Sequence, residues 1–440
     1  MHKYFNDASK IFHLTKNEPL SYLSVLTGIE FNNKSKIITQ QLSFWYQEES
    51  ASVINDSRMV IRFNLLLLPL SRGNIYLHLI AVVFLSFIGL FLIFLSFEKY
   101  FIQKEILLLI ACFGIPSVMF WSSGIMKEGI LIFFIGVFNY NLFKYSTIKL
   151  STLLLGLISF AGIFYSKFYV ALSMLPSLMF LFTIGIFKKK TITYNLVLTI
   201  FVCLFCAYSF NTLLNNLPLQ KLSKKQNDFI NLSIGGVYLV NTNSPYDTIF
   251  TLHKNSLIST NSAENTSIVK LKDGTIYHHW KNPGYSDTLI VKNNGNQYLV
   301  IKELAPTGSA ISLKRLMPNY KSVFALFPEA FINVFFRPFI FDIENMLSFF
   351  ACAENIAIVI LILIVLNNFK PHEKSIQKII VFSCMFVFTL YTLVGLTTPV
   401  LGAAVRYKVP AIPFLILSLF LIYDFGITKF KKFEKILVSK

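Results

Sequence analysis

The sequence predicts an all-α polytopic membrane protein, with about nine transmembrane helices and a small β-rich insert outside the cytoplasm. Three observations predict this fold class. Hydrophobic residues make up 54% of the 440 residues and charged residues only 14%, against about 25% in soluble proteins. The mean hydropathy is +0.60. Long apolar runs alternate with short lysine-rich segments, and one long polar stretch interrupts this alternation.

The chain begins with residues 1–74, which carry scattered charges and aromatic residues but no signal peptide. We expect this segment outside the cytoplasm, carried across either by the first span or by an upstream helix that this start lacks. A helix needs about 20 mostly apolar residues to cross the hydrocarbon core. Runs of about this kind lie at 75–97, 106–122, 128–146, 150–165, 168–187, 191–210, 345–367, 378–396 and 408–426.

The runs at 150–165 and 168–187 are the weakest assignment in this series. Tyr165, Ser166 and Lys167 interrupt them, and the first run is short for a span. They are therefore either two spans or one broken helix. Together the runs predict a first bundle part at 75–210 and a second part, with a tail, at 345–440.

Two segments between the bundle parts lack the character of a span. Residues 211–322 are rich in Asn, Thr and Ser and contain short strand-like runs between glycines and prolines. This pattern predicts a β-rich insert of about 110 residues, a usual size for a compact domain. Residues 323–344 are rich in Phe and broken by Pro328 and Pro338. They predict an amphipathic segment that lies along the outer interface.

The distribution of charge predicts the topology. The net charge is +18, and most lysines lie in the short segments between apolar runs, as they do in cytoplasmic loops. The alternation puts the N-terminus outside and the C-terminus in the cytoplasm. We interpret the charge as topology rather than as nucleic-acid binding, and we expect the lipid bilayer as a partner. The oligomeric state stays open.

Sequence patterns for several other chemistries are missing. All five cysteines lie in apolar runs, so no disulfide framework is implied. No His/Cys cluster has metal-ligand spacing, and no phosphate-binding glycine loop is present, which argues against ATP-driven transport within this chain. We expect His78, in the first span, to pack in the core.

The first candidates for a functional site are Lys127 and Glu128. They follow a turn that begins at Pro116 and precede an apolar run. A charge near a membrane needs a partner, water or a use. The two residues could therefore line a polar cavity at the outer mouth of the bundle, or form an interfacial ion pair that reaches water.

Arg58 and Arg62 are the second candidates, shortly before the first span. Arginines four residues apart share one helix face, and their planar side chains suit bidentate binding of phosphate oxygens. The alternative is a solvated basic segment beside the membrane. The nearby Asp56, and Asp7, could each serve as a general base.

Further candidates flank the second bundle part. Arg337 should lie near the lipid headgroups. Glu354 is the most deeply embedded acid, and a charge at a helix centre costs about 2.5 to 3.5 kcal/mol. It should face the protein interior, either as a structural partner or as a catalytic group. Arg406 and Lys408 lie on the outer side, where the positive-inside pattern disfavours cations, and this favours anion binding.

Four motifs carry a resemblance to a known family: NDSRMVIRFN at 55–64, PSVMFWSSGIMKE at 116–128, FRPFIFDIE at 336–344 with Glu354, and TPVLGAAVRYKVPAIPF at 398–414. At these motifs the chain resembles the GT-C superfamily of membrane glycosyltransferases and, more closely, uncharacterised envelope-polysaccharide membrane proteins of Bacteroidetes. The resemblance spans most of the membrane region.

The resemblance implies a multi-pass protein of the bacterial inner membrane, with active-site loops on the outer face. It also implies a sugar or glycan carried on polyprenyl phosphate or diphosphate. The usual catalytic acid of the superfamily lies in the first outer loop, where Asp7 is the nearest match, but the helix that precedes that loop is absent here. No cofactor is implied with certainty, and a divalent metal stays open.

We therefore expect a membrane glycosyltransferase or polysaccharide polymerase. Asp7 or Asp56 would be the base, and Arg406 with Arg58 would hold the phosphate. One alternative is a flippase or transporter for a lipid-linked glycan, and another is a non-catalytic membrane component whose β-rich insert docks a partner. The leading hypothesis requires that the candidate cations meet at one outer cavity at membrane level.

Overall fold

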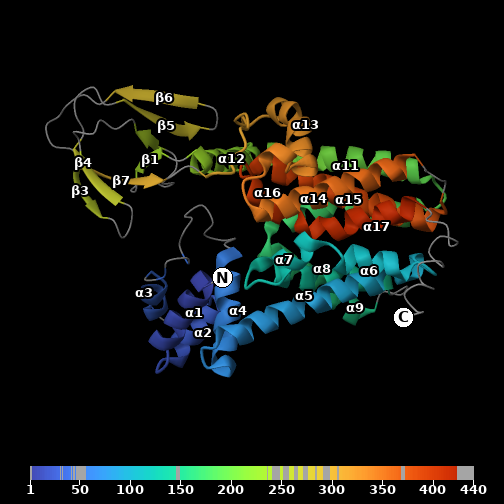
Figure 1. Ribbon diagram of the computed structural model, residues 1–440, viewed down its shortest axis with the longest axis horizontal. Coiled ribbons are helices and arrows are strands. Elements are labelled where there is room, and N and C mark those ends of the chain that lie inside the picture. Colours follow the sequence, from blue (N-terminus) through green and yellow to red (C-terminus); the bar gives the residue numbers. More distant parts are fainter. Residues whose placement is uncertain are drawn as a thin grey trace. The chain divides into compact units, whose positions relative to one another are not determined.

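The structure is a computed structural model of the whole chain, and its helices and strands are coloured along the sequence in Figure 1. It divides into two compact units. The first comprises Met1–Thr199, Ile356–Leu390 and Val409–Lys440, and the second comprises Ile200–Asn355 and Tyr391–Lys408. The structure describes residues 2–29, 31, 33–40, 42, 45, 56–144, 149–234, 236–239, 248–250, 257–261, 266–270, 276–282, 285–290, 298–304, 307–367 and 372–423.

The first unit is helical. Three helices have residues in both units: α11 (Ile192–Leu213), α14 (Met346–Leu366) and α15 (Lys374–Thr397). The elements that lie within the first unit are α1 (His2–Leu14), α2 (Pro19–Thr27), α3 (Lys34–Gln40), α4 (Asp56–Ser71), α5 (Ile75–Phe97), η2 (Glu98–Tyr100), α6 (Glu105–Phe113), α7 (Pro116–Ser122), α8 (Lys127–Lys144), α9 (Leu150–Ser166), α10 (Phe168–Ile186), η5 (Val409–Ala411) and α17 (Ile412–Ile422).

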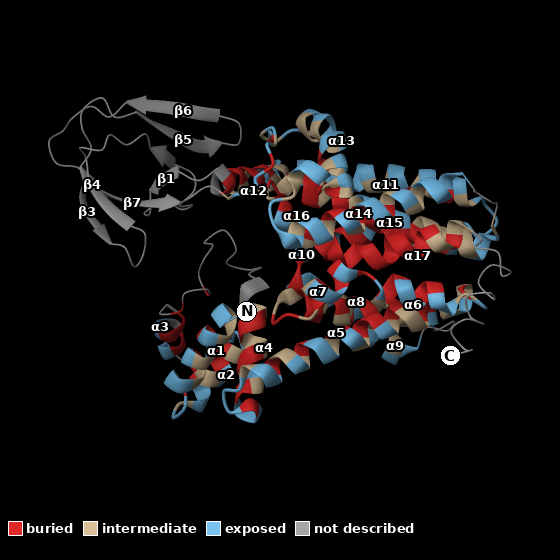
Figure 2. Ribbon diagram, viewed as in Figure 1, coloured by how far each residue is buried: buried red, intermediate tan, exposed pale blue. Residues whose placement is uncertain are grey.

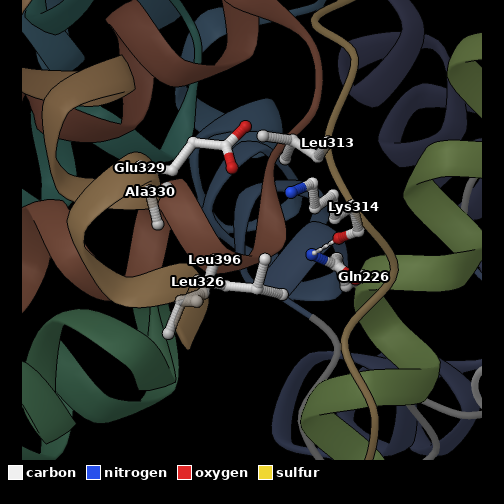
Figure 3. Close-up of a pocket in the computed structure, with 8 residues that line it drawn as sticks. Gln226, Leu313, Lys314, Leu326, Glu329, Ala330 and Leu396 are labelled. Carbon is white, nitrogen blue, oxygen red and sulfur yellow. Dashed lines mark hydrogen bonds between the residues drawn. The ribbon is translucent and has the colours of Figure 1, made fainter. Parts of the chain in front are cut away.

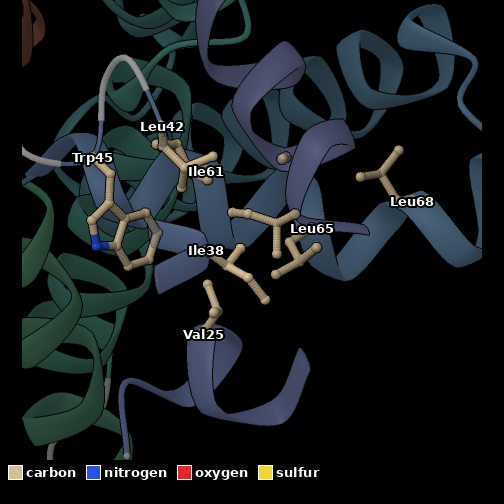
Figure 4. Packing of buried hydrophobic residues seen from close by; sticks show 9 residues of the cluster. Val25, Ile38, Leu42, Trp45, Ile61, Leu65 and Leu68 are labelled. Carbon is tan, nitrogen blue, oxygen red and sulfur yellow. The ribbon is translucent and has the colours of Figure 1, made fainter. Parts of the chain in front are cut away.

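The N-terminal segment folds as the short helices α1 to α4 around a core of its own. Pro19 occupies the first turn of α2, and Gly28 ends this helix with a φ of 81°, a conformation that glycine adopts without strain. The Tyr22 hydroxyl donates to the Leu65 carbonyl at 2.9 Å and ties α2 to α4. Burial raises the pKa of Tyr22, so this hydroxyl stays a donor. Figure 4 shows the core side chains, which include Val25, Ile38, Leu42, Trp45, Ile61, Leu65 and Leu68.

Six helices in the described part of the chain are long and apolar enough to cross a membrane, which indicates a multi-pass membrane protein. A bent pair, α6 and α7, would make a seventh. The six candidate spans are Ile75–Tyr100, Phe168–Ile186, Ile192–Leu213, Met346–Leu366, Lys374–Thr397 and Leu401–Ile422.

The other three of the nine predicted spans do not form single helices that are long and apolar enough to cross a membrane. The run at 106–122 bends by 49° between α6 and α7, where Pro116 begins a new helix. The run at 128–146 forms α8, which includes the charged residues Lys127, Glu128 and Lys144. The run at 150–165 forms α9, which has 17 residues. Apolar composition alone did not separate these helices from complete spans.

Close packing places α8 in the interior of the first unit. A Cβ atom added to Gly136 would lie 2.1 Å from the Gly89 carbonyl oxygen, and one added to Gly89 would lie 2.5 Å from that of Ile132. Only glycine therefore allows α5 and α8 to approach this closely. Next to Glu128, a Cβ on Gly129 would lie 2.6 Å from the Ser122 carbonyl oxygen. These contacts fix the start of α8 against its neighbours.

Aromatic side chains fill the rest of this interior. The rings of Phe97 and Phe143 lie 5.1 Å apart, as do those of Phe143 and Phe382. Phe386 and Phe414 follow at 5.2 Å. Figure 2 shows α17 buried over most of its length, because it supplies apolar side chains on all sides of the helix.

The second unit combines helices with an antiparallel sheet. The strand order of the sheet is β3-β4-β7-β1-β2-β5-β6. Its elements are α12 (Leu217–Ile234), β1 (Gly236–Leu239), β2 (Thr248–Phe250), β3 (Leu257–Asn261), β4 (Thr266–Lys270), β5 (Ile276–Asn282), β6 (Tyr285–Ile290), β7 (Tyr298–Leu304), α13 (Tyr320–Phe336), η4 (Ile340–Asp342) and α16 (Leu401–Lys408).

The polar segment at 211–322 is not made of strands throughout. It begins with the helix α12, whose Gln226 side chain donates to the Lys314 carbonyl at 3.2 Å and accepts from the Leu316 amide at 2.6 Å. The sheet follows between 236 and 304. The segment at 323–344 consists of α13 and η4, and a Cβ on Gly395 would lie 2.0 Å from the Ala330 carbonyl oxygen of α13. The outer placement of both segments stays a prediction.

Candidate functional site

Two arginines of α4 lie against a tryptophan that precedes this helix in the chain. The guanidinium carbons of Arg58 and Arg62 lie 5.5 and 5.4 Å from the centroid of the Trp45 ring, which is a cation–π distance. Arg58 Nε also donates to the Trp45 carbonyl at 3.3 Å. Arg62 Nε donates to the Val25 carbonyl at 2.9 Å. The four-residue spacing places both arginines on one side of the helix, against a tryptophan that is only 5% exposed.

The same side of α4 meets the end of α9. Arg62 Nη1 donates to the Tyr165 hydroxyl, and the Ser166 hydroxyl donates to the sulfur of Met59 at 3.1 Å. Gly28 lies under the guanidinium, since a Cβ at that position would come within 2.6 Å of Arg62 Nη2. Arg62 therefore joins the N-terminal helices to the last residues of α9.

A buried ion pair lies immediately after these residues. Lys167 lies between α9 and α10, as the C-cap of the first helix and the N-cap of the second. Its backbone is extended there, with φ −150° and ψ 97°. Its Nζ atom lies 2.6 Å from Oε1 of Glu128, and the two side chains are 1% and 0% exposed. The ring centroid of Tyr169 lies 5.7 Å from the ammonium. Two charges are thus enclosed between α8, α9 and α10.

This geometry changes the pairing that the sequence suggested for Glu128. Its close partner in the structure is Lys167 rather than the adjacent Lys127. Lys127 is half-buried at the start of α8. Successive residues on a helix point in different directions, so neighbours in sequence do not face each other. The first turn of a helix also favours an acid, and this helps to hold Glu128 at the start of α8.

The two candidate bases lie on different helices of the first unit. Asp7 lies on α1 and is 5% exposed, and α1 packs against α4. Asp7 therefore lies on a helix, and its placement on the outer side stays a prediction. Asp56 begins α4, and its side chain lies outside the described residues. Asp7 and the arginines of α4 thus belong to the same helical cluster.

The second unit contains a lysine whose donors are engaged by the protein. Lys408 Nζ donates to the Val334 carbonyl at 3.3 Å, to the Arg337 carbonyl at 3.2 Å and to Asn355 Oδ1 at 3.0 Å. The Asn355 amide donates in turn to the Phe336 carbonyl. Carbonyls at the end of a helix lack partners within the helix, and a nearby cation satisfies them. Lys408 thus holds α16 to the end of α13, and phosphate binding by its ammonium would require these bonds to break.

Arg337 follows α13 and lies among apolar rings. Its Nη1 atom is 3.6 Å from Oδ1 of Asp342, and its guanidinium carbon is 5.6 Å from the Phe339 ring centroid. Among the described residues its buried Nε atom has no hydrogen-bond partner. Phe341, in the same turn, is 79% exposed. An arginine beside exposed aromatic side chains is the arrangement that suits a lipid interface.

Glu354 and Arg406 are both half-buried. The Glu354 carboxylate interacts electrostatically with the ammonium of Lys408. Glu354 thus has a charged neighbour within its own unit, as expected for an acid in apolar sequence. Arg406 lies in the last turn of α16, where a cation is stabilised by the helix dipole.

The candidates form two groups, one in each unit. Asp7, Asp56, Arg58, Arg62, Lys127 and Glu128 belong to the first unit, and Arg337, Glu354, Arg406 and Lys408 belong to the second. The expected pairing of Arg58 with Arg406 therefore stays a prediction. The sequence did not single out three other residues of the first group as site residues: Trp45, Tyr165 and Lys167.

A feature of the sequence could have identified Lys167. It is a lone lysine between two apolar runs, with no charged residue within ten positions on either side. Such a lysine needs an anionic partner from elsewhere in the chain. The acids that lie at the edge of another apolar run are few, and Glu128 is one of them. No comparable feature points to Trp45.

A separate pocket lies within the second unit, between α12, α13 and the end of α15 (Figure 3). It is a small hollow, and its empty volume of about 190 Å³ includes open solvent. None of the predicted site residues lines it. Its lining residues are Gln226, Leu313, Lys314, Leu326, Glu329, Ala330, Gly395 and Leu396.

A buried histidine in the first unit has a structural environment. His78 is fully buried, and its Nδ1 atom lies 2.8 Å from Oδ1 of Asn64. Its Nε2 atom lies 2.7 Å from the Ser71 hydroxyl. Because the Asn64 amide nitrogen donates to the Val60 carbonyl, its oxygen faces the ring and Nδ1 is the protonated nitrogen. Both ring nitrogens are thus engaged in tying α5 to α4.

In the part of the chain that the structure describes, no group of three or more His, Cys, Asp or Glu residues is arranged to hold a metal ion. Comparisons with family models, with curated proteins and with solved structures gave no match. The function is therefore argued from the chemistry of the described residues.

Proposed function

We propose that this chain is a membrane glycosyltransferase or polysaccharide polymerase that uses a sugar carried on polyprenyl phosphate at the outer face of the inner membrane. The observation that carries the proposal is a group of charges in the first unit. Arg62 and the Lys167–Glu128 pair meet the end of α9, and Arg58 lies against the same Trp45 ring as Arg62. Ionisable groups are expensive in an apolar helical bundle and usually mark a functional site.

The residue types of this cluster fit the reaction. Sugar transfer from a lipid phosphate needs cations that stabilise the negative charge on the departing phosphate. Arginine is suited to this task because its planar side chain binds two phosphate oxygens at once. Arg58 and Arg62 present two such groups on one helix face.

The reaction also needs a carboxylate. The acceptor hydroxyl gives its proton to that carboxylate while the hydroxyl oxygen forms a bond to the anomeric carbon of the donor sugar. The bond from this carbon to the phosphate oxygen breaks in the same step. The phosphate leaves with the bonding electrons. We assign the base to Asp7 or Asp56, since α1 and α4 belong to the same helical cluster as the arginines.

A second candidate function is a flippase or transporter for a lipid-linked glycan. Two helix interruptions favour it: the extended backbone at Lys167 and the 49° bend between α6 and α7. Discontinuous helices of this kind form binding sites in many transporters. Product formation decides between the functions, because a transporter in liposomes forms no new glycosidic bond even when the substrate is supplied on the correct side.

Glycan formation is measured with purified protein in nanodiscs, with a panel of polyprenyl-phosphate-linked hexoses as sugar donors. The double variant Arg58→Gln and Arg62→Gln should reduce the rate of glycan formation by at least about 100-fold, since removal of a single electrostatic stabiliser of the transition state usually has an effect of this size. Glutamine keeps polar donors but removes the charge.

The control is Arg72→Gln, which makes the same substitution at an exposed arginine that follows the end of α4. The φ of Arg72 is 50°, and glutamine meets the same backbone constraint there. This control should keep the wild-type rate. Glycan formation that persists undiminished in the double variant would remove the arginines from the mechanism.

A further inference from the structure

The Glu128–Lys167 pair is not explained by its contribution to folding. Two charges that leave water lose several kcal/mol of hydration each, and their mutual attraction roughly offsets this loss. A well-packed apolar pair would serve α8 and α9 equally well. The pair is nevertheless placed in the interior, with a separation of 2.6 Å and almost no exposure. This placement suggests a use for the charges themselves.

The position of Lys167 points to that use. It lies where α9 stops and α10 begins, so its backbone is already extended and can change direction without breaking a continuous helix. Two residues earlier, Tyr165 accepts a hydrogen bond from Arg62. A further cation therefore lies on the segment that Arg62 of α4 contacts. The Glu128 carboxylate is the anion that this cation holds.

We propose that Lys167 is a phosphate-binding residue for the lipid-linked substrate, and that Glu128 occupies its ammonium until the substrate phosphate displaces it. A carboxylate and a phosphate oxygen are interchangeable partners for an ammonium group, because both are anionic oxygen acceptors. The proposal deepens the function proposed above and rests on it. It adds a cation that completes the arginine cluster and an internal anion that competes with the ligand.

Competition between Glu128 and the substrate phosphate for Lys167 predicts the direction in which the binding affinity changes. Glu128→Gln keeps an oxygen acceptor for Lys167 but removes the negative charge that the phosphate must displace. The variant should therefore bind polyprenyl phosphate more tightly than the wild type does, by about tenfold, which corresponds to 1.4 kcal/mol. In contrast, a residue that only supports the fold would weaken binding or leave it unchanged when it is replaced.

The experiment measures equilibrium binding to the full chain in nanodiscs with three probes: polyprenyl phosphate, the uncharged polyprenol and inorganic phosphate. The double variant Glu128→Gln with Lys167→Met removes both charges and leaves neither unpaired. It should bind polyprenyl phosphate at least about tenfold more weakly than Glu128→Gln alone. Inorganic phosphate that binds as tightly as polyprenyl phosphate would identify a free anion rather than a lipid headgroup as the ligand.

Two further variants keep the test decisive. Glu128→Asp keeps the charge but withdraws the carboxylate by one methylene, so it should show a smaller gain in affinity than Glu128→Gln. It takes the place of Glu128→Gln in the test if that variant does not fold. Glu98→Gln is the matched control, because Glu98 is an exposed acid in the same unit whose side chain is 46% exposed. It should bind like the wild type.

The outcomes separate this inference from the proposed function. Wild-type binding of polyprenyl phosphate, with no gain in either folded Glu128 variant, would overturn the inference and leave the arginine cluster in place. Absence of any preference for polyprenyl phosphate over polyprenol in the wild type would overturn both. A gain in Glu128→Gln that disappears in the double variant is the result we expect.

Discussion

Lys167→Met alone should lower the free energy of unfolding by about 3 to 5 kcal/mol, because it leaves the Glu128 carboxylate buried without its partner. Glu128 is 0% exposed and lies within the interior packing of α8, so water does not reach it readily. The effect is measured by equilibrium unfolding of the purified protein in mixed detergent micelles. It should be among the largest effects of any single substitution in the first unit.

Two comparisons make this prediction specific. The double variant Glu128→Leu with Lys167→Met should recover most of the lost stability, because an apolar pair needs no compensation. Lys144→Met removes an exposed partner, 3.9 Å from Glu98, and should cost at most about 1 kcal/mol. If Lys167→Met proved no more harmful than Lys144→Met, the buried pair would not exist as described.

Lys408→Met should destabilise the protein by about 2 to 4 kcal/mol. The substitution removes three donors and leaves the carbonyls of Val334 and Arg337 without them, and each buried acceptor without a partner costs about 1 to 3 kcal/mol. It also removes the charge that balances Glu354. Unfolding measured under the same micelle conditions reports the loss.

The matched control for this substitution is Lys321→Met on α13. Lys321 is exposed, so its replacement should change stability by less than about 0.5 kcal/mol, as is usual for surface positions. Lys408 is 4% exposed. Equal stability of the two variants would show that Lys408 does not hold α16 to the end of α13.

The sequence predicted the fold where the apolar runs are long and uninterrupted. The six candidate spans coincide with such runs, since length and hydropathy decide membrane crossing. The same criterion counted α8 and α9 as spans. Length and hydropathy do not reveal the packing of Gly136 on Gly89, which places α8 in the interior. That packing depends on which helices become neighbours in the fold.

The site was predictable to the extent that it depends on local spacing. The four-residue interval of Arg58 and Arg62 implied a shared helix face, and both side chains lie against Trp45. The partner of Glu128 depends on a contact between positions 39 residues apart. Neither spacing nor composition specifies such a contact. The adjacent Lys127 was therefore the nearest partner that the sequence offered.

The candidates of the second unit illustrate another limit of sequence reasoning. An outer lysine is disfavoured by the positive-inside pattern, and this favoured anion binding for Lys408. The structure supplies it with three oxygen acceptors of the protein itself. Two of these are main-chain carbonyls, a chemical group that every residue carries. A sequence therefore gives no indication of which ones a side chain will reach.

Binding of polyprenyl phosphate to the full chain in nanodiscs tests the central claim most directly, namely that the cations of the first unit hold the phosphate of a lipid carrier. The wild type should bind polyprenyl phosphate in preference to polyprenol, and the double variant of Arg58→Gln and Arg62→Gln should bind it at least about tenfold more weakly. Arg72→Gln should bind like the wild type. Equal binding of the charged and uncharged lipids, or unchanged affinity in the double arginine variant, would contradict the claim.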